Sequence, residues 1–138
     1  MSRNAEDSQT ALIKAAQAVR AHAHAPYSRF AVGAAVLDEQ GRIHAGCNVE
    51  NAAYPQGWCA EASALAVMVA AGGKRVQAVA VCAEGAELVT PCGGCRQKLR
   101  EFAADDCPVW AADMSGLRAS HTLGELLPSS FGPQHLKF

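Results

Sequence analysis

Short apolar segments that favour strands alternate with helical patterns along this chain, and this alternation constrains the fold more than any other feature. The strand-like segments are residues 30–37, 42–49, 76–82 and 108–111. The helical patterns cover residues 8–24, 59–71, 92–103 and 123–127. Strands separated by helices indicate a largely parallel or mixed sheet covered by helices. A length of 138 residues suits one domain, 1–138, of the α/β class.

Residues that break regular structure set the expected ends of several segments. Pro26 is expected to end the first helix, because proline cannot continue the helical hydrogen-bond ladder. Residues 38–41, Asp-Glu-Gln-Gly, form a turn that makes the strands on either side a hairpin. Gly72 and Gly73 are expected to end the helix that begins near Cys59.

Charge and hydrophobicity limit the partners that the chain can have. The formal net charge is -1, whereas a nucleic-acid surface needs a basic stripe that displaces counterions. No apolar run approaches the ~20 residues that span a membrane. A small or uncharged substrate therefore fits better than a polymer, and we expect neither a nucleic-acid nor a membrane partner.

The six cysteines are informative because of the compartment that the sequence predicts. They are Cys47, Cys59, Cys82, Cys92, Cys95 and Cys107. The first ten residues lack the apolar core of an export signal, so we expect a cytoplasmic protein. Disulfides are rare in a reducing compartment, and clustered cysteines there indicate metal ligands or reactive thiols.

Two motifs carry the expected chemistry. In Pro91-Cys92-Gly93-Gly94-Cys95, two thiols three residues apart at a helix start suit one Zn²⁺, because the positive end of a helix favours thiolates. A redox Cys-x-x-C pair is the alternative. In Cys59-Ala60-Glu61, a third thiol precedes a carboxylate that is placed to face a metal-bound water. Alternatively, Glu61 complements a helix dipole and Cys59 is an apolar core residue.

Taken together, the two motifs are more specific than either one alone. Three protein ligands leave one coordination position of Zn²⁺ open, as in catalytic sites, where bound water becomes acidic. A structural site would need a fourth ligand, and His44, Cys47, Cys82 and Cys107 offer the atom types without paired spacing. The pattern Cys-x-Glu followed by Pro-Cys-x-x-Cys is typical of zinc deaminases, in which the glutamate moves protons.

With these motifs the chain resembles the small homotetrameric cytidine deaminases over nearly its whole length. The matching segments are APYSRFAVGAAV (25–36), GCNVENAAYP (46–55), CAE (59–61), PCGGCRQ (91–97) and ELLPSSFGPQHL (125–136). The resemblance implies a three-layer α/β/α fold with a five-stranded mixed sheet. It also implies one zinc ion per subunit, cytidine and deoxycytidine as substrates, and a homotetramer whose subunits share active sites.

The resemblance also implies a set of substrate contacts. Asn48 and Glu50 would hold the ribose 3′-hydroxyl, and without the resemblance they would be interpreted as a solvated loop pair. The other implied contacts are Phe30, the backbone of Ala60, and, from neighbouring subunits, Ala52, Tyr54 and Phe131.

One position departs from the pattern of many three-cysteine members, which place an arginine directly after the glutamate. This chain has Ala62 there, while zinc with three thiolates carries a formal charge of 2 − 3 = −1. A more negative site makes bound water less acidic. We expect the helix N-termini at Cys59 and Cys92 to offset this charge, with Arg96 as a possible further source.

Three other functions compete with cytidine deamination. A deaminase of another aminopyrimidine nucleoside, such as blasticidin S, is compatible with Ala62. A structural zinc module without turnover is disfavoured by Glu61 and the open coordination position. Polynucleotide editing is disfavoured by the near-zero net charge.

Overall fold

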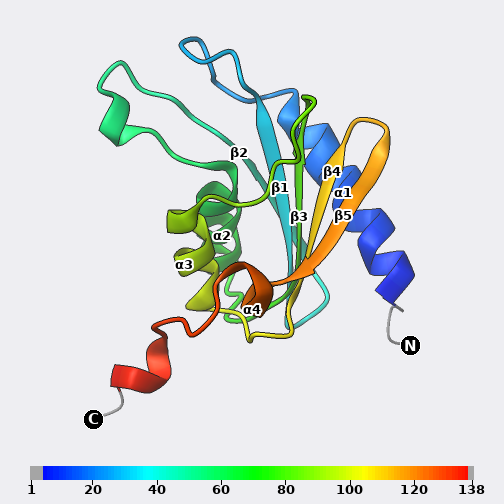
Figure 1. The fold of residues 1–138 in the computed structure, drawn as a ribbon, viewed down its shortest axis with the longest axis vertical. Coiled ribbons are helices and arrows are strands. Elements are labelled where there is room, and N and C mark those ends of the chain that lie inside the picture. Colours follow the sequence, from blue (N-terminus) through cyan, green and yellow to red (C-terminus); the bar gives the residue numbers. More distant parts are fainter. Residues whose placement is uncertain (1–4, 137–138) are drawn as a thin grey trace.

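A five-stranded mixed sheet forms the middle layer of the protein (Figure 1). The computed structural model describes residues 5–136, and the first four and last two residues of the predicted domain 1–138 lie outside the described residues. The strands are β1 Val32–Asp38, β2 Ile43–Cys47, β3 Val76–Ala83, β4 Pro108–Asp113 and β5 Gly116–Thr122. Their order is β2-β1-β3-β4-β5, and only β3 and β4 pair in parallel.

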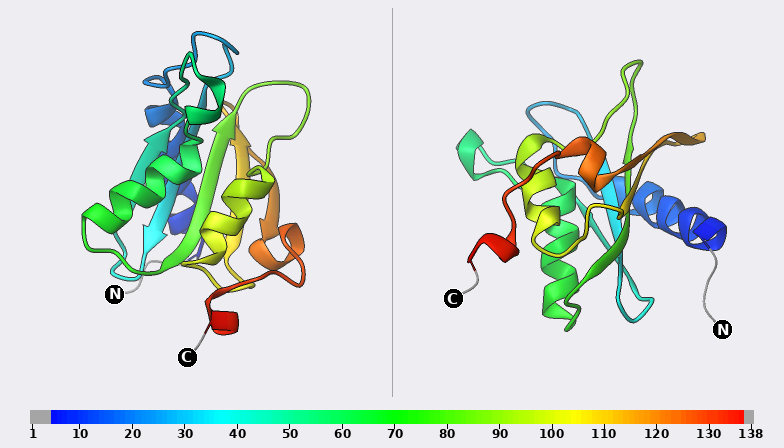
Figure 2. Two further views of the ribbon diagram at one scale, coloured as in Figure 1. Left: turned by 90° about the vertical axis from the view of Figure 1, so that its left-hand side faces the viewer. Right: turned by 60° about the horizontal axis from the view of Figure 1, so that its bottom comes forward.

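Helices cover both faces of this sheet. Figure 2 shows α1 on one face and α2 and α3 beside each other on the opposite face. The helices are α1 Ala5–Arg20, α2 Ala60–Ala70, α3 Gly93–Arg100 and α4 Leu123–Leu126, with short 3-10 turns η1 Tyr54–Gln56 and η2 Pro133–Leu136. The predicted three-layer α/β/α fold with a five-stranded mixed sheet is confirmed. Within residues 5–136, no helix combines the length and hydrophobicity needed to cross a membrane.

Successive side chains of a strand point to opposite faces of the sheet, so the core consists of two apolar layers, one on each face. On β1, Ala34 and Val36 pack with α2, whereas Ala35 and Leu37 pack with α1. All four side chains are buried, because β1 has helices on both faces. The backbones of β1 and α1 lie so close together that a Cβ on Gly33 would be 2.0 Å from the carbonyl oxygen of Ala16.

One sequence expectation about the elements is wrong, and one strand was missed. The first helix ends at Arg20, well before Pro26, because the next residues pair with another segment. The His24 backbone N–H donates to the Asn48 carbonyl (3.0 Å), and the Glu50 N–H donates to the His24 carbonyl (2.8 Å). The residue pattern also did not identify β5, a largely polar edge strand that pairs with β4.

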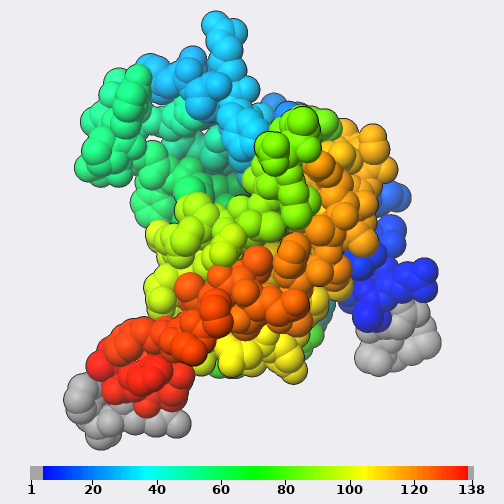
Figure 3. Space-filling model, viewed as in Figure 1, coloured from blue at the N-terminus to red at the C-terminus, as the bar shows by residue number. Residues whose placement is uncertain are grey.

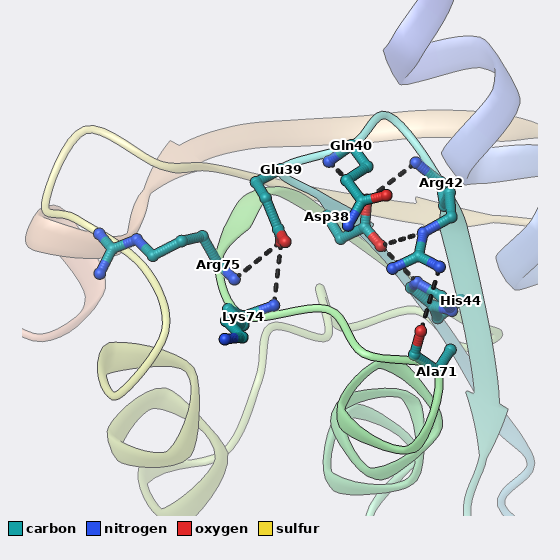
Figure 4. Close-up of polar contacts among 8 residues, drawn as sticks. All are labelled: Asp38, Glu39, Gln40, Arg42, His44, Ala71, Lys74 and Arg75. Atoms are coloured by element: carbon teal, nitrogen blue, oxygen red, sulfur yellow. Dashed lines mark hydrogen bonds and ion pairs between the residues drawn. The ribbon is translucent and has the colours of Figure 1, made fainter.

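A buried carboxylate joins the β1–β2 hairpin to the end of α2 (Figure 4). Asp38 is fully buried, and its Oδ2 atom lies 2.8 Å from both Arg42 Nε and His44 Nε2. Its Oδ1 atom accepts the backbone N–H groups of Gln40 and Arg42, and Arg42 also donates to the Ala71 carbonyl. Burial alone would raise the pKa of Asp38, but these hydrogen bonds hold it far below its ordinary value.

This network predicts an acid-sensitive contribution to stability. Because folding depresses the pKa of Asp38, the contribution is present above its unfolded pKa of about 3.9 and is lost as pH falls toward the folded value. Asp38→Asn should lower the free energy of unfolding at pH 7 by about 2–4 kcal/mol, because the buried carboxylate that accepts hydrogen bonds from Arg42 and the hairpin backbone is lost. Urea unfolding between pH 3 and 7 should show a flatter pH dependence for the variant. Parallel pH curves would contradict this account.

Candidate active site and metal centre

The site is built at the N-termini of two neighbouring helices. Cys59 is the N-cap of α2 and Cys92 the N-cap of α3, and neither helix has a side-chain cap. The first-turn N–H groups of a helix lack intrahelical partners and carry partial positive charge. Both capping positions therefore favour a thiolate.

Three thiols converge at this point. The sulfur atoms of Cys59, Cys92 and Cys95 all lie within 4.8 Å of one another, and Cys59 Sγ is 3.9 Å from Cys92 Sγ. Tetrahedral zinc with Zn–S bonds of about 2.3 Å requires sulfur atoms about 3.8 Å apart. Among residues 5–136, no other cluster of at least three metal-ligating side chains has such a geometry. The residues fit zinc, and the predicted cofactor is confirmed.

Two of the three thiols have raised pKa values, so without a cation they favour the protonated form. Burial raises the pKa of Cys95, and the negative charges of Glu61, Cys59 and Cys92 raise it further. Burial likewise raises the pKa of Cys59. For Cys92 burial acts in the same direction, but the Cys95 backbone N–H and neighbouring thiols lower its pKa overall. A bound divalent cation reverses such repulsion and keeps the thiols deprotonated.

Glu61 lies in the first turn of α2 and is only 4% exposed. Burial raises its pKa, while its own backbone N–H, the Cys95 thiol and the Lys98 ammonium act more weakly in the opposite direction. A carboxyl group with a raised pKa exchanges protons near neutral pH more readily than an exposed one. Glu61 is thus suited to act as a proton carrier beside the three thiols.

Gly46 on β2 allows α2 to pack closely enough to the sheet to place Glu61. A Cβ at this position would lie 2.4 Å from the backbone nitrogen of Ala64 and 2.7 Å from Ser63. Sequence reasoning did not identify Gly46 as a site residue, although a glycine inside a strand is a signal of close backbone approach.

A hollow of about 440 Å³ lies in front of the thiols. Of the predicted site residues, it is lined by Phe30, Asn48, Glu50, Tyr54, Cys59, Ala60, Glu61 and Cys92. Cys95 is fully buried and is not among the lining residues. The lining also includes Trp58, which sequence reasoning missed and which is 58% exposed. The structure therefore brings most of the predicted contacts to one cavity.

Two predicted contacts do not line this hollow within the single chain. Ala52 is exposed, and Phe131 is 56% exposed and stacked on His135. Figure 3 shows the segments around residues 50–57 and 128–136 projecting from the body on the same side of the view. The Phe131 carbonyl is held by Gln97 Nε2 at 2.9 Å.

Asn48 and Glu50 hold the loop that forms one wall of the hollow. Asn48 Oδ1 accepts the Val32 N–H (2.8 Å), and its Nδ2 donates to the Phe30 carbonyl (2.8 Å). Glu50 accepts hydrogen bonds from residues 27–28. Both side chains are half-buried and fixed by the protein, unlike a solvated loop pair.

Arg96 is engaged with backbone next to the site. Its guanidinium donates to the carbonyls of Pro91 (2.6 Å) and Leu126 (2.8 Å) and to Thr90 Oγ1 (2.8 Å). It thereby fastens the loop that leads into α3, and its predicted role in charge compensation stays a prediction. Ala62 is buried in an apolar hollow that Lys98 also lines.

A three-layer α/β/α fold that brings three converging thiols and a buried glutamate to one site is that of a zinc-dependent hydrolytic deaminase. The family model described as "Cytidine and deoxycytidylate deaminase zinc-binding region" matches residues 6–111. The chain belongs to this deaminase family.

Named relatives agree with this assignment. A cytidine deaminase of Sporosarcina psychrophila is 40% identical over 92% of this chain and 93% of its own length. One of Mycobacterium tuberculosis is 43% identical over 81% of this chain and 80% of its own length. The crystal structure of cytidine deaminase from Burkholderia pseudomallei matches with a TM-score of 0.82 and 42% identity, covering 88% of this chain and 98% of that one.

The close packing at Gly46 predicts that its replacement disturbs the metal centre. Gly46→Ala should displace the first turn of α2 and cost roughly 1–3 kcal/mol of stability, because the backbone on both sides must move. Thermal unfolding and metal analysis should show a lower Tm and less bound zinc. The matched control is Gly57→Ala, whose added Cβ meets nothing closer than 3.5 Å. Equal effects of the two substitutions would contradict the assigned role.

The two helix N-termini predict how the zinc site responds when a positively charged side chain is introduced at position 62. Zinc is released in acid as the thiolates become protonated. Ala62→Arg should lower the pH of half-release by less than about half a unit, because first-turn N–H groups already offset the thiolate charge. A chelator assay across pH measures this. A shift of about one unit or more would show that the compensation in the native site is incomplete.

Proposed function

We propose that this chain catalyses the hydrolytic deamination of free cytidine and deoxycytidine to uridine and deoxyuridine, with release of ammonia, as a step of pyrimidine salvage. The observation that carries the proposal is the buried Glu61 beside three converging thiols in a hollow of about 440 Å³. A cavity of this size suits a small molecule. The chain would act as one catalytic domain.

Glu61 would carry the protons of the reaction. Zinc, when held by Cys59, Cys92 and Cys95, supplies an acidic water for attack on C4 of the pyrimidine. Glu61 accepts a proton from the attacking water and delivers it to N3. Glu61 then takes the proton of the new C4 hydroxyl and transfers it to the amine, so that the C4–N bond breaks, ammonia departs and the C4 carbonyl forms. One carboxyl group within hydrogen-bond reach of these atoms suffices for all the transfers.

The polar wall of the hollow would bind the ribose 3′-hydroxyl. A carboxylate has about four acceptor positions, and three of those on Glu50 are occupied by residues 27–28. Asn48 uses one of its two amide N–H groups on Phe30. Glu50 therefore retains one acceptor position and Asn48 one amide N–H, and a single hydroxyl can donate to the first and accept from the second. Phe30 and the backbone of Ala60 would contact the rest of the nucleoside.

We also propose a homotetramer in which subunits complete one another's sites. Tyr54, Trp58 and Phe131 are more than half exposed in the single chain, so each offers apolar surface for burial between subunits. In this arrangement Ala52 and Phe131 would reach a neighbouring hollow, as would Tyr54, which also lines the hollow of its own chain. All six cysteines are free thiols, in keeping with a cytoplasmic protein.

The carboxyl group of Glu61 provides the decisive test of the function. The zinc-loaded protein should convert cytidine to uridine and ammonia, and chelation of zinc should stop the reaction. Glu61→Ala should retain zinc, because Glu61 is not a ligand, while kcat falls at least about 100-fold with the proton carrier gone. Ultraviolet absorbance, ammonia release and metal analysis measure these effects.

Two outcomes would contradict the proposal. Turnover near the wild-type rate in Glu61→Ala would remove the assigned role of the carboxyl group. Deamination of blasticidin S with no reaction on cytidine would place the chain with deaminases of another aminopyrimidine.

A further inference from the structure

The loop in front of Glu50 forms a tight turn with an unusual backbone conformation. The Arg29 N–H donates to the Ala25 carbonyl (2.9 Å), and Arg29 has a φ of 57°. Non-glycine residues rarely adopt this left-handed region, and such conformations persist where the surrounding structure enforces them. The turn directs the N–H groups of Tyr27 and Ser28 to Glu50 Oε1, at 3.0 and 3.1 Å. Successive backbone N–H groups of this kind form an anion-binding concavity.

The Ser28 hydroxyl connects this turn to two residues of the hollow. The Phe30 N–H donates to Ser28 Oγ (3.0 Å), and Ser28 Oγ contacts Glu50 Oε2. A backbone N–H is only a donor and a carboxylate is only an acceptor, so the single hydroxyl proton points to Glu50. Within residues 5–136, Ser28 is the only residue whose side chain donates a hydrogen bond to Glu50.

Without this hydroxyl, the carboxylate would be fixed at one oxygen only. The backbone N–H groups of Tyr27 and Ser28 both meet Oε1, so Oε2 would be free to turn about that anchor. Oε2 is also the oxygen with the remaining acceptor position. The Ser28 hydroxyl is the largest influence lowering the pKa of Glu50, which keeps this oxygen an acceptor.

We propose that Ser28 is a positioning residue that aims the free acceptor of Glu50 at a substrate hydroxyl and thereby selects substrates that carry that hydroxyl. The inference rests on the proposed function, since the hydroxyl concerned is the 3′-hydroxyl of cytidine. Ser28 does not contact the reacting atoms in this account. It acts through Glu50, and its removal should affect binding more than the chemical step.

The test compares cytidine with 3′-deoxycytidine, which lacks the hydroxyl. For Ser28→Ala, KM for cytidine should rise about tenfold, as expected for loss of one hydrogen bond to a charged group. Its kcat for cytidine and its KM for 3′-deoxycytidine should stay within about twofold of wild type, because neither depends on a hydrogen bond between Glu50 Oε2 and the 3′-hydroxyl. Ser28→Thr keeps the hydroxyl and should restore the wild-type KM.

A double-mutant cycle tests whether Ser28 acts through Glu50. In a Glu50→Gln background, Ser28→Ala should raise KM for cytidine by less than about twofold further, since coupled residues are not additive. Ser115→Ala, at an exposed turn away from the hollow, is the matched control and should behave as wild type. If Ser28→Ala does not fold, Ser28→Cys retains a weaker donor and should give an intermediate KM.

The possible failures are distinguishable. Equal effects on both substrates, no effect on either, or additivity with Glu50→Gln would overturn the role of Ser28 while the deaminase function stands. Absence of cytidine turnover in the zinc-loaded wild-type protein would overturn the proposed function, and the inference about Ser28 with it.

Discussion

The convergence of two helix N-termini is the constraint on which the rest of this structure depends. Cys59 and Cys92 cap α2 and α3, and Cys95 follows one turn later, so three sulfur atoms meet only if both helices start at one point. The sheet meets this requirement by packing both helices on the same face. The same convergence removes Glu61 from water and leaves a hollow in front of the thiols.

The residues that form the metal centre were predictable because their signal is local in sequence. Cys-x-Glu and Pro-Cys-x-x-Cys each specify a helix start with its donor atoms, and the alternation of strands and helices identifies the α/β class. The sequence could not supply the features that depend on distant partners. The strand β5 has little apolar periodicity and is stabilised by pairing with β4, and the early end of α1 depends on pairing of His24 with residues 48–50.

The same distinction holds within the candidate site. Asn48 and Glu50 were expected from family resemblance. Their hydrogen bonds to residues 27–32 could not be predicted, because these partners are distant in the sequence. Trp58 lines the hollow without a sequence motif to mark it. Arg96, expected as a further source of positive charge beside the helix N-termini, donates three hydrogen bonds to two loop carbonyls and to Thr90, and these contacts could not be foreseen from its position beside Cys95.

Gly33 and Gly46 have a consequence that reaches beyond their own positions. They lie on adjacent strands of one hairpin, one against the backbone of α1 and the other against the backbone of α2. At both positions only a hydrogen atom fits between the strand and the helix, so backbone packs directly on backbone with no side chain between them. The β1–β2 hairpin is therefore fixed by backbone contact with α1 at one glycine and with α2 at the other. Glu61, in the first turn of α2, owes its position to this packing on both faces of the sheet.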